Sequence, residues 1–205
     1  PISSMLPLYL PAILLLLLTP PTSSAPLADS LLDAAQLGDL ERVRRLVTDA
    51  DAPDVNVRDT SARTPLIFAA EYGDPAIVQE LVAAGADLDS QDMYGWSALH
   101  WATDTEHTAA AHELLQRGAS VNIADSDGWS ALHWAAYRGF LPLVRELVAG
   151  GAEVGQRTRM DRSTARSYTA WDLASMYGHR EVAAFLHNST HQYDRRISPL
   201  VLPFN

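Results

Sequence analysis

Apolar residues recur along most of the chain at the spacing of short amphipathic helices. Leu66, Ala69 and Ala70 fall on one face of a first helix, and residues 77–82 supply the apolar face of a second. The small alanine side chains allow neighbouring helices to approach closely. Thr64 precedes the first helix as an N-cap, because its hydroxyl can accept from the first free backbone N–H groups. The pattern predicts a pair of short helices packed together.

This pattern is an internal repeat with a constant period. The first-helix block occupies residues 64–70, 97–103 and 130–136, with a looser copy at 169–175 and an earlier one marked by Leu31, Ala34 and Ala35. Each second helix is followed by a glycine suited to a left-handed cap, at Gly85, Gly118 and Gly151. Tight glycine-containing turns are expected at residues 92–96 and 125–129. The two halves repeat in phase, which predicts one structural unit stacked several times.

These blocks, T/S-P/A-L-x-x-A and Gly-Ala-x-Val/Leu-Asn/Asp, resemble the ankyrin-repeat family, whose unit has the same length and carries T-P-L-H-x-A. The resemblance covers about residues 29–187. It implies an all-α ankyrin-repeat solenoid of about five helix-turn-helix units with β-turn connections. Units one to five span about residues 29–58, 59–91, 92–124, 125–157 and 158–187. The outer units diverge, as capping units do, and stability comes from stacking.

Three departures from the family pattern affect local geometry. A six-residue insertion precedes Thr169, and Ile67 replaces the signature histidine in unit two. Glu106 stands where Gly73 and Gly139 end the first helix of units two and four. Because glycine enters the left-handed region without steric cost, we expect an irregular turn at Glu106.

Residues 1–28 have the layout of a signal peptide. The apolar run Leu6–Leu18 is followed by small residues at Ser23 and Ala25, although no positive charge precedes it. The run is shorter than the roughly 20 residues of a spanning helix. We expect a secretory or periplasmic protein; the alternatives are a membrane anchor, a cytoplasmic protein with an incidental leader, and a fragment of a larger protein. Residues 188–205 are expected to be a tail that is disordered or lies over the last helix.

Composition and charge narrow the function. The 205 residues include no cysteine and no lysine, which excludes disulfides, cysteine-bound metals, thiol catalysis and Schiff-base chemistry. The net charge is −10, and residues 1–155 carry −13 while residues 156–205 carry +3. An acidic surface disfavours a nucleic-acid partner and favours a protein partner with a basic patch.

Candidate chemistry is sparse. The resemblance implies that His100 and His133 are structural and hydrogen-bond the preceding hydroxyl and the turn of a neighbouring unit. Residues 125–128 begin like a calcium loop but lack the glycine and glutamate at its sixth and twelfth positions. We therefore expect no catalytic residues, no metal and no cofactor, and predict that the protein is not an enzyme. Asn188 begins an N-linked glycosylation sequon, Asn-Ser-Thr.

The resemblance implies that a partner protein binds the concave face, which is the face formed by the turn tips and the first helices. The candidate binding residues are Met93, Tyr94, Trp96, Trp129, Tyr137 and Arg138. Tyrosine and tryptophan are frequent interface anchors. In the alternative interpretation, Trp96 and Trp129 pack on each other and shield the turns. Trp101 and Trp134 are expected to pack between repeats and Trp171 to lie in the core.

The insertion forms a second candidate site. Four arginines, Arg157, Arg159, Arg162 and Arg166, could dock an acidic protein, a phosphate or an anionic membrane surface, or lie in a solvated loop. The expected function is therefore a non-catalytic, monomeric protein-interaction module that meets a membrane only through an uncleaved N-terminal segment. The alternatives are an exported or tethered adaptor, a fragment of a larger ankyrin-containing protein, and a small-molecule or enzymatic role at the insertion.

Overall fold

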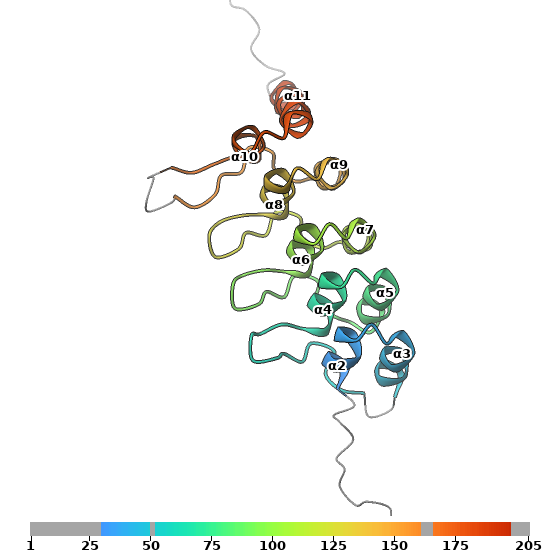
Figure 1. Ribbon diagram of the computed structural model, residues 1–205. Helices are drawn as coiled ribbons and strands as arrows, with labels where there is room; N and C mark the ends of the chain where they lie inside the picture. Colours follow the sequence, from blue (N-terminus) through green and yellow to red (C-terminus); the bar gives the residue numbers. More distant parts are fainter. Residues whose placement is uncertain (1–29, 50–51, 161–165, 198–205) are drawn as a thin grey trace, which may run out of the picture.

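The computed structural model describes residues 30–49, 52–160 and 166–197, which form a row of stacked helix pairs (Figure 1). These residues contain ten α-helices and no β-strand, so the predicted all-α solenoid is confirmed. One layer consists of the first helices: α2 (Leu31–Gln36), α4 (Pro65–Glu71), α6 (Ala98–Asp104), α8 (Ala131–Arg138) and α10 (Ala170–Met176). The other layer consists of the second helices: α3 (Leu40–Thr48), α5 (Pro75–Ala83), α7 (Thr108–Gln116), α9 (Leu141–Ala149) and α11 (Arg180–Ile197).

The connections between units project as long turns on the side of the first helices, away from the second helices (Figure 1). Successive first helices pack against each other, as do successive second helices. The alanines Ala69, Ala102, Ala135 and Ala174 are fully buried along this row. Their small side chains permit the close spacing that lets consecutive turns lie side by side.

Local sequence explains where the two helices of unit two begin. The Thr64 hydroxyl accepts from the N–H of Ile67 at 3.3 Å, and Pro65 occupies the first turn of α4, where its missing donor costs nothing. The Asp74 carboxylate accepts from the N–H groups of Ala76 and Ile77 at 3.0 and 3.1 Å and so caps α5. Helix α4 buries all but its last residue, which fixes its position between neighbouring units.

Main-chain hydrogen bonds join the turn tips of neighbouring units. The N–H of Met93 donates to the carbonyl of Ser61, and the N–H of Ser126 to the carbonyl of Tyr94, both at 3.0 Å. A Cβ atom on Gly95 would lie 2.8 Å from the backbone nitrogen of Ser126, so the close approach of the two tips requires glycine there. The tips therefore form a continuous, hydrogen-bonded edge.

Glu106 does not distort its turn, contrary to the expected irregularity. Its φ of 61° places it in the same left-handed conformation as Gly73 and Gly139, at 74° and 80°. The N–H of His107 still bonds the carbonyl of Ala102 at 2.8 Å, as its counterparts do in the neighbouring units. Packing on both sides imposes the regular geometry, and the non-glycine residue bears the strain.

The C-terminal helix continues beyond residue 187, where the sequence pattern ends the last unit. Helix α11 runs to Ile197, so the first part of the segment 188–205 is helical. None of the helices that the structure describes is long and apolar enough to cross a membrane. The apolar leader, residues 1–28, lies outside the described residues.

The strain at Glu106 gives a stability prediction. Replacing Glu106 with glycine removes the clash of a Cβ atom in the left-handed region, and we expect unfolding to cost about 1 kcal/mol more. The melting temperature should rise by about 2–4 °C. Thermal unfolding followed by circular dichroism measures the change.

The matched control is Glu106→Ala, which removes the carboxylate but keeps the Cβ atom. It should give no such rise. An equal gain from alanine and glycine would show that the carboxylate, and not the backbone, is the source of the strain.

Candidate functional site

The candidate site begins at an aspartate that opens each central turn. In unit three, Oδ1 of Asp92 accepts from the N–H groups of Tyr94 and Trp96 at 2.8 and 2.9 Å. In unit four, Oδ1 of Asp125 accepts from the N–H groups of Asp127 and Trp129 at 2.9 and 2.8 Å. The short carboxylate folds the backbone around itself, as in an Asx turn.

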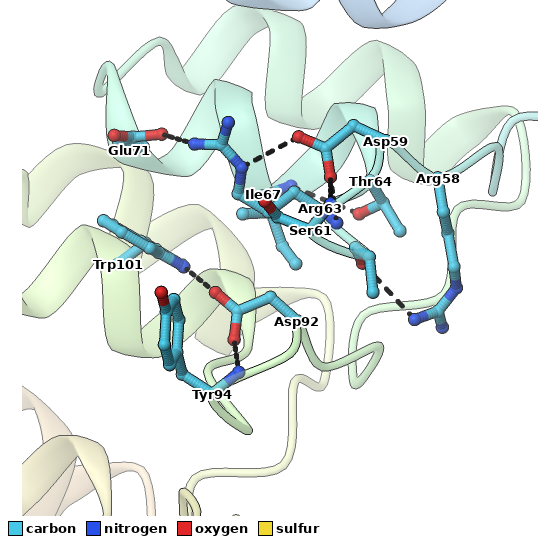
Figure 2. Close-up of polar contacts among 11 residues, drawn as sticks. Arg58, Asp59, Ser61, Arg63, Thr64, Ile67, Glu71, Asp92, Tyr94 and Trp101 are labelled. Atoms are coloured by element: carbon cyan, nitrogen blue, oxygen red, sulfur yellow. Dashed lines mark hydrogen bonds and ion pairs between the residues drawn. The ribbon is translucent and has the colours of Figure 1, made fainter.

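The second oxygen of the same carboxylate orients a tryptophan on the first helix. Oδ2 of Asp92 accepts from Nε1 of Trp101 at 3.0 Å, a contact visible in Figure 2, and Oδ2 of Asp125 accepts from Nε1 of Trp134 at 3.1 Å. Both aspartates are buried, with 7% and 6% of their surface exposed. A single residue thus fixes the turn and the indole that packs beside it.

Six aromatic rings form a continuous row over units three to five, which we call the aromatic ladder. In order, its members are Trp101, Trp96, Trp134, Trp129, Tyr137 and Tyr177. The centroids of neighbouring rings lie 4.9, 4.7, 4.7, 5.7 and 4.5 Å apart. The tyrosine contacts are edge-to-face, a geometry favoured by the ring quadrupoles.

Two buried histidines form hydrogen bonds that support the segments carrying the ladder. Nδ1 of His100 accepts from the N–H of Ser97 at 3.2 Å, and Nε2 lies 3.1 Å from the carbonyl of Trp129. His133 makes the same contacts with Ser130 and, at 3.0 Å, with the carbonyl of Gln156. Because Nδ1 accepts from a backbone N–H and a carbonyl can only accept, each ring is neutral with its proton on Nε2. The hydroxyl oxygens of Ser97 and Ser130 also lie 2.9 Å from these Nδ1 atoms, so the expected contacts with the preceding hydroxyl and with the neighbouring unit are both present.

Burial lowers the pKa of both histidines below the usual value, because desolvation penalises the charged ring. For His100, the Trp129 carbonyl and the charges of Asp125 and Asp92 oppose this effect without overcoming it. For His133, the carbonyls of Gln156 and Tyr168 and the charge of Asp125 do the same. Both rings therefore stay neutral near pH 7, which keeps the Nδ1 acceptors available.

Two hollows lie along the ladder. The first, of about 290 Å³, is lined by Tyr94, Trp96, Trp101, Trp134 and the unit-four tip, residues 125–127. The second, of about 500 Å³, lies one repeat further on; its lining includes Trp129, Trp134, Arg159, Met160 and Tyr168. Asp125 and Asp127 border the first hollow, whereas the second is bordered by Asp127 and by Arg159.

The structure brings the predicted binding residues onto one face. Met93 and Tyr94 project from the unit-three tip, and each is 61% exposed. Trp96, Trp129 and Tyr137 are half-buried in the ladder. Arg138 donates from Nε and a terminal nitrogen to Asp104 of unit three, at 2.9 and 2.6 Å.

The tryptophans agree with expectation only in part. Trp96 and Trp129 do not contact each other as a stacked pair; the ring of Trp134 joins them. Trp101 and Trp134 pack as expected and also line the first hollow. The expected core position of Trp171 is wrong, because its side chain is 41% exposed on α10, beyond which no described first helix follows.

The basic insertion extends the tip of unit five. The N–H of Thr158 donates to the carbonyl of Tyr168, and the N–H of Tyr168 donates back to the Thr158 hydroxyl, both at 2.9 Å. Arg157 donates to the hydroxyl and carbonyl oxygens of Ser167 at 3.0 and 2.9 Å. Arg159 and Arg166 are exposed, and Arg162 lies outside the described residues.

The remaining candidates are the glycosylation sequon, a metal site and the calcium-loop-like turn. Asn188 is exposed and lies within α11. Among the residues that the structure describes, no group of three or more His, Asp or Glu side chains could hold a metal ion. The loop of residues 125–128 is an inter-repeat turn whose Asp125 carboxylate accepts from N–H donors.

Comparison with known proteins identifies the family. The sequence model for ankyrin repeats (3 copies) matches residues 31–125 and 118–196, which together span most of the chain. The chain therefore belongs to the ankyrin-repeat family. Ankyrin repeats are generally protein-interaction modules and generally non-catalytic.

Individual relatives share short stretches. The chain is 39% identical over 71 residues to Neurogenic locus notch homolog protein 1 of Xenopus tropicalis, covering 35% of this chain and 3% of that protein. It is 39% identical over 71 residues to Ankyrin repeat and SAM domain-containing protein 6 of Mus musculus, covering 34% and 8%. It is 42% identical over 50 residues to Palmitoyltransferase AKR1 of Saccharomyces cerevisiae, covering 24% and 6%. The matched stretch is thus a small part of each relative.

The lowered histidine pKa values give a pH prediction. In the unfolded chain each histidine titrates near its ordinary pKa of about 6.5, whereas the folded chain binds the proton less readily. The unfolded state therefore binds more protons below about pH 6.5, and stability falls as pH decreases from there. The limit is about 1.4 kcal/mol per pH unit for each histidine. Urea unfolding between about pH 7 and about pH 5 measures it.

The control replaces both histidines with glutamine, which does not titrate and suits the third helical position of a capping box. The slope of stability against pH should flatten in this double variant. An unchanged slope would assign the pH dependence to other groups.

Proposed function

We propose that the chain binds another protein through the concave face of units three to five, without catalysis of its own. The aromatic ladder carries this proposal. Its tryptophan rings are half-buried and supported by Asp92, Asp125, His100 and His133, so a partner meets a surface that is already ordered. A preorganised surface loses little conformational entropy on binding, and aromatic rings provide large contact areas.

The negative charge of this chain indicates what kind of partner surface would bind it. The full chain carries −10 and residues 1–155 carry −13, while Met93 and Tyr94 at the unit-three tip add exposed apolar area. Tyr94 lines the first hollow together with Asp127. A basic patch around an apolar centre complements this surface, since opposite potentials steer association. The proposed partner is therefore a protein with such a patch, bound by a monomer of this chain.

The location of this activity is a separate proposal. The run Leu6–Leu18 followed by small residues favours an exported protein or an adaptor tethered through an uncleaved leader. The alternatives are a cytoplasmic protein and a part of a larger ankyrin-containing protein. N-terminal sequencing of the mature chain, together with fractionation of the producing cells, distinguishes cleavage after Ala25 from retention of the leader.

Partner capture tests the binding face. The full chain and the double variant Met93→Ala/Tyr94→Ala should differ by at least about tenfold in the partner retained, because central interface side chains carry most of the binding free energy. Both residues are 61% exposed, so the fold should tolerate their removal. Quantitative mass spectrometry of captured proteins gives the ratio.

Leu37→Ala is the control, since Leu37 is 74% exposed in unit one, away from the ladder. It should retain the partner fully. Retention should also weaken as salt is raised, because screening shortens the reach of the acidic surface. Equal capture by the Met93→Ala/Tyr94→Ala variant and the unaltered chain would contradict binding at this face.

A further inference from the structure

The chain itself contains a cation held by an aromatic ring and two carboxylates. In unit two, the guanidinium of Arg63 lies 4.2 Å from the centroid of the Phe68 ring. Its nitrogens contact the carboxylates of Asp59 at 3.0 Å and Glu71 at 3.3 Å, as Figure 2 shows. This is a cation–π contact reinforced by ion pairs.

One repeat later the cation is replaced by an aromatic ring. In the alignment of consecutive units, the positions of Asp59, Arg63, Phe68 and Glu71 become those of Asp92, Trp96, Trp101 and Asp104 in unit three. The acids and the first-helix aromatic remain, but an indole replaces the arginine. Asp104 pairs with Arg138 of unit four, whereas Asp92 accepts only N–H groups within the described residues. Tyr94 and Trp134 complete the wall of the first hollow.

The carboxylates behind this hollow have little accepting capacity left for a ligand. Asp92 and Asp125 each accept two backbone N–H groups and one indole N–H. The negative charge of these carboxylates lies directly behind the rings that they orient, and it favours a cation on the open side of those rings. Asp127, which is exposed at the edge of the hollow, adds another negative charge.

This combination discriminates between cations. An unmodified lysine ammonium carries three N–H donors and loses hydrogen bonds to water when it enters an aromatic-walled hollow with few acceptors. A trimethylated ammonium keeps the charge, has no N–H donor and presents methyl groups to the ring faces. Recognition of quaternary ammonium groups by aromatic walls is a general use of the cation–π interaction.

We propose that the first hollow binds the methylated ammonium group of a lysine side chain on a partner protein. This inference rests on the proposed function and adds the chemical group that the concave face selects. Asp127 lines both hollows, but the first also has Asp125 in its wall, whereas Arg159 lies at the edge of the second and repels a cation. The first hollow is therefore preferred.

The test uses the full chain and three peptides that differ at one side chain. Each peptide is built from glycine, serine and alanine around a central lysine, trimethyl-lysine or the neutral isostere in which carbon replaces the quaternary nitrogen. NMR titration follows the indole N–H signals. The trimethyl-lysine peptide should bind at least about tenfold more tightly than either of the others and should shift the Trp101 and Trp134 signals.

Each alternative occupant has its own outcome. Equal affinity for the neutral isostere would make the hollow a plain apolar site, and equal or tighter binding of unmodified lysine would make charge alone the determinant. Tighter binding of an otherwise identical arginine peptide would assign the hollow to guanidinium. Any of these results, or no indole shift at millimolar trimethyl-lysine peptide, overturns the inference.

Variants locate the site. Trp96→Leu removes one wall and should weaken the trimethyl-lysine peptide at least about tenfold, whereas Trp171→Leu removes an exposed indole outside the hollow and should leave binding unchanged. Circular dichroism checks that both variants fold. If Trp96→Leu does not fold, the comparison of the charged peptide with its neutral isostere in the unaltered chain still decides the question.

Failure of this inference is distinguishable from failure of the proposed function. A partner that depends on Met93 and Tyr94 but is captured equally with or without lysine methylation leaves the function standing and removes the ligand assignment. If every concave-face variant still binds both the partner and the peptide, the proposed function and the ligand assignment are both wrong.

Discussion

The aspartate at the start of each central turn is the constraint on which the aromatic ladder depends. One oxygen of Asp125 accepts two backbone N–H groups of its turn, and the other accepts the indole N–H of Trp134. Asp92 does the same in unit three. A single buried carboxylate therefore couples the shape of a surface turn to the orientation of an aromatic ring. Repetition of this device in consecutive units turns separate rings into a ladder.

The same scaffold carries different surfaces in different units. In unit two, Arg63 occupies the position that Trp96 has in unit three, and its guanidinium pairs with Asp59 and Glu71. In unit three, an indole takes that place, and Asp104 pairs instead with Arg138 of the next unit. Asp92 has no arginine partner of this kind among the described residues and accepts the indole N–H of Trp101. The backbone is nearly unchanged, since the tips remain joined by equivalent hydrogen bonds. The side chains at equivalent positions thus set the character of each unit's surface, while stacking of the units keeps that surface rigid.

The repeat made the fold predictable, because apolar spacing and capping residues recur in phase and each is a local signal. The same signals located Met93, Tyr94, Trp96 and Trp129 at the tips. They could not show that Trp134 joins Trp96 to Trp129, since that contact depends on the distance between stacked units. The exposure of Trp171 was missed because its position in a first helix does not reveal that no further first helix follows α10 among the described residues. The regular turn at Glu106 likewise follows from packing imposed by adjacent units.

The coupling of turn and ring is tested most directly by indole hydrogen exchange. The N–H groups of Trp101 and Trp134 donate to buried carboxylates, so their NMR signals should exchange with solvent more slowly than that of Trp171. Asp125→Ala should remove the protection of Trp134 and leave that of Trp101. If the indole groups of Trp101, Trp134 and Trp171 exchange at similar rates in the unaltered chain, the aspartates do not hold the rings and the account is wrong.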